Sequence, residues 1–230
     1  MGYKAKETYQ YKDAQGRAVY EAVRLRDGYP KRFLMRRGDP QNPGHLIHSI
    51  QGVRRVLYRL PELLAADVKL PVFLVIGERH ADRLAQAGLV ATTYCQGVHG
   101  WREDYVDFFR GREVVLLPKN NVDGYEHSRG IVNSLLAVTP SVKILDLPGL
   151  AHGGDVSDWI NAGGKKKDLL ALAKATPECE TQLFDLRQRS ARVESRPMSV
   201  EELEDRIKNQ GAAGTTPFKQ PNQGRKTNER

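Results

Sequence analysis

The chain has 230 residues, 40% of them hydrophobic, and a formal net charge of +8. It contains no apolar run near the roughly 18 residues of a transmembrane helix and starts without the apolar stretch of a secretory signal, so we expect a cytoplasmic protein with no membrane partner. The two cysteines, Cys95 and Cys179, lack the spacing of a zinc site or a disulfide framework. We expect both thiols to be reduced.

The positive charge is distributed unevenly along the chain. Residues 1–69 carry a net charge of +7, residues 70–164 carry −3, and residues 165–230 carry +4. A clustered basic excess is typical of a surface that binds a polyanion, whereas an even spread serves solubility. The two basic segments therefore favour a polyanionic partner, and they flank the segment in which we expect the chemistry.

Residues 1–69 are predicted to form a small, basic, antiparallel β subdomain. Alternating side chains and turn residues indicate strands over 7–12, 18–26 and 32–37, with a turn at 13–16. A loop at 39–44 and a helix after Pro61 are expected to follow.

The second strand of this subdomain has two different faces. Val19, Val23 and Leu25 are predicted to share one face, while Arg24 and Arg26 share the other with Tyr20. A basic and aromatic surface suits phosphates and bases, although a solvated outer face explains the pattern equally well. The residues predicted to bind nucleic acid are Arg24, Arg26, Lys31, Arg32, Arg36, Arg37, Arg54, Arg55 and, from the next segment, Lys119.

Residues 70–164 alternate between apolar runs and amphipathic segments, which predicts an α/β fold with a mostly parallel sheet and helices on both faces. The continuous runs LPVFLV and EVVLL are typical of buried parallel strands. The predicted strands cover 70–75, 89–94, 113–117 and 142–147, and the predicted helices cover 78–87, 102–109, 124–136 and a short segment that includes Trp159.

The remaining residues are predicted to form a helical extension over 165–210 and a disordered basic tail over 211–230. Ser199 and Glu202 have the spacing of a capping box, which indicates a helix over 200–209. The tail is rich in Gly, Pro, Gln, Asn and basic residues and has almost no apolar content.

The candidate site residues follow the predicted parallel strands, because open α/β sheets bind ligands at the carboxyl ends of their strands. Val75 is followed by IGERH, Leu117 is followed by PKNNVDG, and the loop after Leu147 reaches GDVSDW.

These motifs, in this order, resemble the TOPRIM domain of phage- and plasmid-type DNA primases over residues 70–164. The matching segments are LVIGERHADRLAQAGLVATT, GWREDYVDFFRGREVVLLPKNNVDG and VKILDLPGL with GGDVSDWINAGG. The earlier YKDAQGR and GVRRVLYRLPELL are similar to the segment that introduces that domain. The resemblance implies a TOPRIM-like, Rossmann-like fold and a role in DNA replication in a mobile element or a bacterial host.

The resemblance also implies a degenerate active site. In the family, a glutamate of an E-G-x-x-D pattern handles protons and a later D-x-D pair binds Mg²⁺. Carried over position by position, these acids fall on Ile76, His80, Lys119 and Asn121, and the family's later acidic pair is matched by Asp155 and Asp158. Ile76 cannot exchange a proton, and a lysine about 4 Å from Mg²⁺ costs on the order of 8 kcal/mol at an effective dielectric near 20. We therefore expect no catalytic residues, no metal ligands and no cofactor.

Three functions stay open at this point. The first is a primase-like accessory protein that binds single-stranded DNA or replication proteins without autonomous catalysis. The second is an active primase or nuclease with a shifted Mg²⁺ site built from Glu78, Asp155 and Asp158. The third is a protein-interaction module that no longer binds nucleic acid.

Lys119 has two interpretations of its own. Its charge could stand in for the metal, so that the crevice attracts a phosphate beside a helix N-terminus. It could equally be a solvated loop lysine. Acids near the predicted helix starts, such as Asp123, are similarly either displaced metal ligands or first-turn acids that favour the helix dipole.

Overall fold

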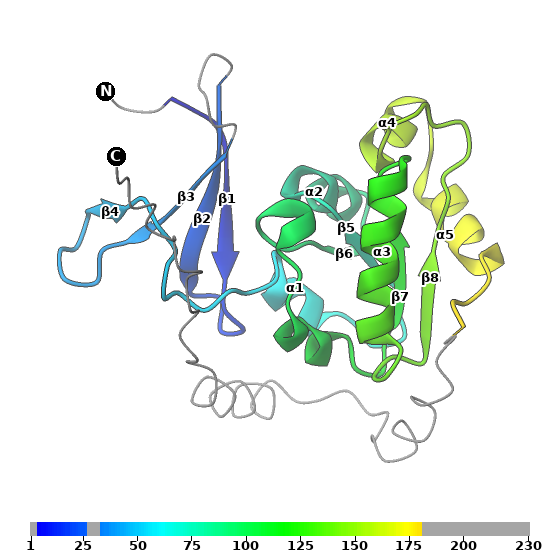
Figure 1. Ribbon diagram of the computed structural model, residues 1–230, viewed down its shortest axis with the longest axis horizontal. Coiled ribbons are helices and arrows are strands. Elements are labelled where there is room, and N and C mark those ends of the chain that lie inside the picture. The colour runs from blue at the N-terminus through cyan, green and yellow to red at the C-terminus, as the bar shows by residue number, and fades with distance from the viewer. Residues whose placement is uncertain (1–3, 27–32, 181–230) are drawn as a thin grey trace, which may run out of the picture. The chain divides into compact units, whose positions relative to one another are not determined.

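The structure is a computed structural model that describes residues 4–26 and 33–180, which belong to one compact unit (Figure 1). It contains an antiparallel sheet in the order β1-β2-β3-β4 and a parallel sheet in the order β6-β5-β7-β8.

The strands of the antiparallel sheet come first in the chain, and the elements of the α/β part follow. The N-terminal sheet is formed by β1 (Ala5–Lys12), β2 (Ala18–Leu25), β3 (Phe33–Gly38) and β4 (Leu46–Ile47). The α/β part consists of α1 (Leu60–Ala65), β5 (Val72–Val75), α2 (Glu78–Gln86), β6 (Val90–Thr92), η1 (Gly97–His99), η2 (Glu103–Phe109), β7 (Glu113–Leu117), α3 (Val122–Leu135), β8 (Ser141–Ile144), α4 (Val156–Asn161) and α5 (Lys166–Ala175).

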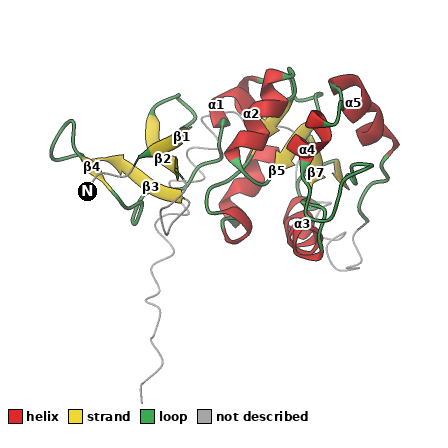
Figure 2. Cartoon of the chain, turned by 90° about the horizontal axis from the view of Figure 1, so that it is seen from above, coloured by secondary structure: helices red, strands yellow, loops and turns green. Residues whose placement is uncertain are grey.

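The central strands of the parallel sheet are β5 and β7. All four residues of β5 and the last four of β7 are buried, as the continuous apolar runs predict. Figure 2 shows α3 on one face of this sheet and α2 with α5 on the other. The chain leaves β5 toward α2 and leaves β7 toward α3, so the two connections diverge to opposite faces. This divergence creates the crevice in which open α/β sheets bind ligands.

The N-terminal sheet packs one face against the α/β part through tyrosines. Tyr11 of β1 stacks on Tyr20 of β2 with their ring centroids 4.5 Å apart. The Tyr20 hydroxyl donates to the Val56 carbonyl oxygen at 3.0 Å and lies 3.5 Å from the Cys95 sulfur. Tyr20 is only 1% exposed.

This burial overturns one prediction from the sequence. Tyr20 was expected on an open surface beside Arg24 and Arg26, available to stack on bases. It instead fills the core between the sheet and the α/β part, where its ring stacks on Tyr11 and its hydroxyl contacts Val56 and Cys95. The basic face therefore lacks its predicted aromatic member.

The other predicted elements agree closely with the described ones. The mixed α/β architecture is confirmed, with a parallel sheet preceded by a small antiparallel one. Residues 103–109 form a 3₁₀ rather than an α-helix, because the buried side chains repeat every three residues, at Tyr105 with Phe108 and Val106 with Phe109. Both cysteines are free thiols.

Some predictions cannot be followed in the structure. The predicted helix at 200–209 and the tail at 211–230 lie outside the described residues, as do Lys31 and Arg32. Residues 165–210 are represented there only by α5 and the residues around it. The domain boundaries stay a prediction. Within the part of the chain that is described, no helix combines the length and apolar character needed to cross a membrane.

Candidate functional site

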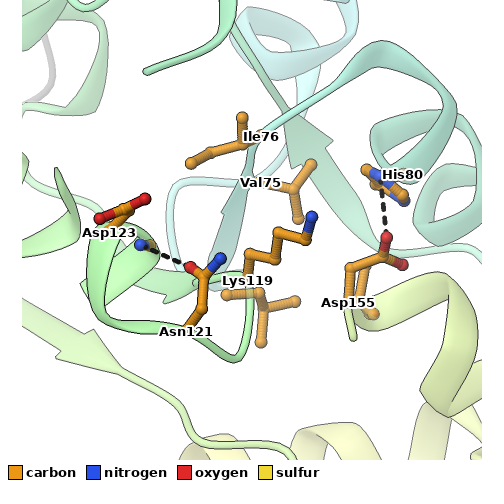
Figure 3. A pocket seen from close by; sticks show the side chains of 10 residues that line it. Val75, Ile76, His80, Lys119, Asn121, Asp123 and Asp155 are labelled. Atoms are coloured by element: carbon orange, nitrogen blue, oxygen red, sulfur yellow. Dashed lines mark hydrogen bonds and ion pairs between the residues drawn. The ribbon is translucent and has the colours of Figure 1, made fainter. Parts of the chain in front are cut away.

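A pocket of about 350 Å³ lies at the carboxyl ends of β5 and β7 (Figure 3). We call it the strand-end pocket. Its lining residues are Val75, Ile76, His80, Leu117, Lys119, Asn121, Asp123, Gly124, Asp155 and Val156. The structure therefore brings the four positions that the resemblance marks as altered into one cavity, together with Asp155.

The turn after β5 is shaped by Gly77. Its φ of 114° lies in a region that favours glycine, and a Cβ there would sit 3.1 Å from the His80 ring. The Gly77 amide donates to the Thr93 hydroxyl at 3.0 Å, which ties the turn to the neighbouring strand. This turn leaves Ile76 at the end of the strand and starts α2 so that His80 faces the pocket.

The turn after β7 depends on close packing between Gly124 and Lys119. A Cβ on Gly124 would lie 2.3 Å from the Lys119 carbonyl oxygen, so a side chain there cannot be accommodated without backbone movement. Asn121 caps α3 by accepting from the Gly124 amide at 2.9 Å. Lys119 is exposed, and in Figure 3 its side chain reaches across the pocket between Val75 and Asp155.

Asn120 fixes the loop that leads into Asp155 and Val156 of the pocket lining. Its backbone amide donates to the Gly154 carbonyl oxygen at 2.8 Å, and its backbone carbonyl oxygen accepts from the Gly153 amide at 2.7 Å. Its side-chain nitrogen donates to the Leu150 and Ala151 carbonyl oxygens at 2.9 and 3.0 Å. One residue thus joins the end of β7 to the loop before α4.

Asp155 and Asp158 form a capping box at the start of α4. The Oδ1 atom of Asp155 accepts from the Ser157 amide at 2.7 Å and the Asp158 amide at 3.3 Å. Oδ2 of Asp158 accepts from the Asp155 amide at 2.9 Å. The GDVSDW motif therefore has a complete structural role as a helix start. Asp155 lines the strand-end pocket, and Asp158 does not.

His80 connects α2 to α4. Its Nδ1 lies 2.7 Å from the Ser157 hydroxyl oxygen, and its Nε2 lies 3.5 Å from Oδ2 of Asp155. Burial lowers the pKa of His80 below its ordinary value, against the opposing effect of the Asp155 carboxylate. Ser157 is only 4% exposed, so this serine, histidine and aspartate arrangement does not present an accessible nucleophile.

Glu78 faces away from the strand-end pocket. It is 7% exposed, and its Oε1 accepts from the Tyr11 hydroxyl at 2.7 Å. We call this contact region, formed by Glu78 with Tyr9, Tyr11, Tyr20 and Tyr58, the tyrosine interface. Burial raises the pKa of Glu78, while the hydrogen bond from Tyr11 partly opposes that shift.

The pocket does not fit a Mg²⁺ ion. The side chains at the carboxyl ends of β5 and β7 include a lysine cation and an isoleucine, whereas Mg²⁺ requires oxygen ligands in near-octahedral array. One oxygen of Asp155 is already shared by two helix amides. Among residues 4–26 and 33–180, no group of three or more His, Cys, Asp or Glu side chains could hold a metal ion.

The predicted nucleic-acid-binding arginines are found in several environments. Arg24 pairs with Glu7 at 3.3 Å, and Arg36 pairs with Glu21 at 2.8 Å. Arg55 donates to backbone carbonyls of the 50–53 loop. The side chains of Arg26 and Arg54 are exposed, and Arg37 is half-buried.

Two residues of the site could not be selected from the sequence. Ser157 contacts His80 across a separation of 77 residues, and Asn120 holds a loop about 30 residues further along the chain. The pair Asn120 and Asn121 after β7 predicts a turn, but the sequence does not show which of the two side chains contacts the loop at residues 150–151. Asp123, for which the sequence left open a displaced metal ligand or a first-turn acid, lies in the first turn of α3 and lines the pocket.

Solved structures of DNA primases have a similar fold. The Aquifex aeolicus primase, comprising zinc-binding and RNA polymerase domains, superposes with a TM-score of 0.56 at 19% identity, over 87% of this chain and 44% of that chain. The E. coli primase catalytic core gives a TM-score of 0.55 at 18% identity, over 74% and 52%. The DnaG primase catalytic domain bound to ssDNA gives 0.55 at 17% identity, over 88% and 69%.

The fold of this chain is similar to part of the DNA primase catalytic core. This primase-like chain spans about half the length of the Aquifex aeolicus and E. coli chains. No family model matches the sequence, and no curated protein matches it. At identities below 20%, the agreement concerns the fold, and function has to be argued from the site.

Proposed function

We propose that this chain is a primase-like protein that binds single-stranded DNA and lacks autonomous catalysis, acting as an accessory of DNA replication or of a mobile element. One observation carries the proposal. The strand-end pocket lies where an open α/β sheet places its ligand, and it presents Ile76, His80, Lys119 and Asn121 at the positions where the resembled domain has acids.

The side chains at these four positions remove the basis for two catalytic steps. Ile76 has no proton to exchange, so it cannot act as a general acid or base. Lys119 places a positive charge where a divalent cation would have to bind. Metal-assisted phosphoryl transfer and metal-assisted strand cleavage therefore cannot be assigned to these side chains.

Binding to nucleic acid is supported by the charge and by the fold. The net charge of +7 in residues 1–69 gives the N-terminal segment an electrostatic attraction to phosphates. Arg26 and Arg54 keep exposed side chains there. One of the solved structures with this fold contains bound ssDNA.

Two titrations on the same sample test the proposal. Calorimetry with Mg²⁺ and Mn²⁺ should show no binding below millimolar concentration. Fluorescence anisotropy with a labelled oligonucleotide should show binding that weakens with salt, with a log–log slope of about −0.7 for each phosphate contacted. DNA binding that ignores salt would favour the protein-interaction module instead.

A variant pair tests the surface. Arg26→Gln should weaken binding uniformly across DNA sequences and reduce the magnitude of the salt slope by about 0.7. Arg129→Gln, which removes an exposed arginine from α3, is the matched control and should leave the affinity unchanged. Equal effects of the two substitutions would show that net charge, rather than the N-terminal surface, drives association.

The active-enzyme alternative has one observation in its favour, since Asp155 lines the strand-end pocket. It requires tight binding of a divalent ion that Asp155→Asn abolishes, together with primer synthesis or nicking by the wild-type chain. That combination of results would replace the proposal with an active primase or nuclease.

A further inference from the structure

We propose that the start of α5 is a second surface for single-stranded DNA, on which Lys165 and Lys167 contact phosphates of a strand that also reaches the basic residues 1–69. This inference rests on the proposed function, because it takes single-stranded DNA as the ligand. It adds a separate region of contact, at the end of the α/β part, to the basic N-terminal segment.

The start of α5 departs from two rules of helix stability. A helix start favours a side chain that accepts hydrogen bonds from the free amides, but the N-cap residue is Lys165, whose ammonium group has no acceptor. The next two residues, Lys166 and Lys167, place positive charges at the positive end of the helix dipole. Helix α4 has the usual arrangement, with Asp155 and Asp158 in a capping box. The lysines therefore disfavour α5, and such departures are expected where side chains serve a function.

Only one of the three lysine side chains has a contact within the fold. All three are exposed, and none belongs to the ion pairs of residues 4–26 and 33–180. Lys166 donates to the Gly88 carbonyl oxygen at 2.7 Å, which ties α5 to the end of α2. Within the same residues, the ammonium groups of Lys165 and Lys167 make no such contact. The fold therefore does not account for these two cations.

The charge of this turn is positive even when its acid is included. Asp168 is the acidic residue of the first turn, and its Oδ2 accepts from the backbone amide of Lys165 at 3.3 Å. Residues 165–168 thus carry three cations and one carboxylate. Ammonium groups are partners of phosphodiester oxygens, and each contact also releases counterions from the strand. A nucleic acid backbone is therefore the ligand that this surface fits.

The turn before α5 gives the lysines a fixed starting point. The amides of Gly163 and Gly164 donate to the Ile160 and Trp159 carbonyl oxygens at 3.0 and 3.1 Å. A Cβ on Gly164 would lie 2.3 Å from the Trp159 ring, so the indole packs directly against this backbone. Trp159 is itself buried. Because the backbone is already held, binding a phosphate here orders little more than the lysine side chains.

The lysines and the antiparallel sheet lie far apart in the described structure. Figures 1 and 2 both show α5 at the end of the α/β part that is remote from β1, β2 and β3, with the parallel sheet between. A strand long enough to reach both regions gains affinity, because its second contact is intramolecular. A short strand can occupy only one region. Affinity should therefore depend on strand length through Lys165 and Lys167.

Fluorescence anisotropy with labelled oligothymidylates of two lengths tests the inference, one of about 8 and one of about 40 nucleotides. The double variant Lys165→Ser with Lys167→Gln keeps the structural contact of Lys166. It should weaken binding of the longer strand on the order of tenfold at about 0.1 M salt, and reduce the magnitude of the salt slope by about 1.4, because two contacts of about 0.7 each are lost. The shorter strand should bind as it does to the wild type.

Stability separates a binding role of Lys165 from a structural one. Lys165→Ser supplies a side chain that can cap α5, so the midpoint of thermal unfolding should rise by on the order of 2 °C. The longer strand should bind this variant more weakly than the wild type. A lower midpoint would show that the lysine stabilises the helix start, and it would overturn the inference.

The matched control is Arg129→Gln with Lys174→Gln, which removes two exposed cations from α3 and from the last turn of α5. It should bind both strands like the wild type. The inference is overturned if the double variant binds the longer strand like this control, or if it loses affinity equally for both lengths. Either result leaves the proposed function standing, whereas a wild-type protein that binds neither strand would contradict both.

Discussion

Helix α2 starts between two regions with opposite character. On one side Glu78 enters the tyrosine interface, where it is buried and held by the Tyr11 hydroxyl. On the other side His80 faces the strand-end pocket, which is lined by Lys119, Asp123 and Asp155 together with apolar side chains. Glu78, the acidic residue of the IGERH segment after β5, thus contributes to the core rather than to the pocket. Whether an acidic side chain can act in the pocket therefore depends on which layer packs over it as well as on its chemical type.

The tyrosine interface should show the largest response to substitution. Tyr11→Phe removes the hydrogen bond that the buried Glu78 carboxyl accepts, and we expect a loss of about 1–3 kcal/mol in the free energy of unfolding. Denaturant unfolding measures the loss. In a Glu78→Leu background the same change should cost far less, because no buried polar group is left unpaired. An equal loss in both backgrounds would mean that the hydroxyl has another role.

The same interface predicts a pH dependence with a definite sign. Burial raises the folded-state pKa of Glu78 above 4.5, so folding favours the protonated acid. The contribution to stability is complete below the unfolded pKa and is lost as pH rises through the folded pKa. Unfolding of wild type and Glu78→Gln should therefore diverge as pH rises above 4.5, with the wild type losing stability relative to the variant. Parallel pH profiles would contradict a buried, perturbed Glu78.

Substitution of Asp155 should have an intermediate effect on stability, because this residue both caps α4 and lines the pocket. Asp155→Ala should cost about 1 kcal/mol through loss of the cap, while Asp155→Asn should cost little because asparagine caps helices equally well. Thermal unfolding distinguishes the two. A large loss for Asp155→Asn would show that the carboxylate charge itself, beside His80, stabilises the fold.

The smallest effect on stability is expected in the pocket. Lys119 is exposed and outside the described ion pairs, so Lys119→Met should change the free energy of unfolding by less than about 0.5 kcal/mol. Denaturant unfolding and the oligonucleotide titration are measured on the same variant. Loss of DNA binding with unchanged stability would mark a binding residue, whereas loss of both would mark a structural one.

The parallel sheet could be predicted from sequence because its strands are buried on both faces and appear as continuous apolar runs. β7 begins and ends at the predicted residues, Glu113 and Leu117. β8 ends earlier than predicted, at Ile144, although Leu145 and Leu147 are still buried. Hydrophobicity alone cannot separate a residue in the ladder from one that is buried just beyond it.

The N-terminal sheet was harder to predict, and Tyr20 shows why. Alternation along a strand divides its residues into two faces but does not say which face a second layer covers. The pocket was easier, because the ends of parallel strands meet at one edge. That rule brings Ile76, His80, Lys119 and Asn121 together. It gives no information on the direction of Glu78, which depends on contact with Tyr11, 67 residues away.

The hydrogen bonds of Asn120 have a consequence for how freely the neighbouring side chains can vary. The backbone and side chain of this residue hold the loop that leads into Asp155. Asn121 still caps α3, and Lys119 only projects into the cavity. The side chains at these two positions can therefore change while the backbone contacts that hold the loop before α4 are kept.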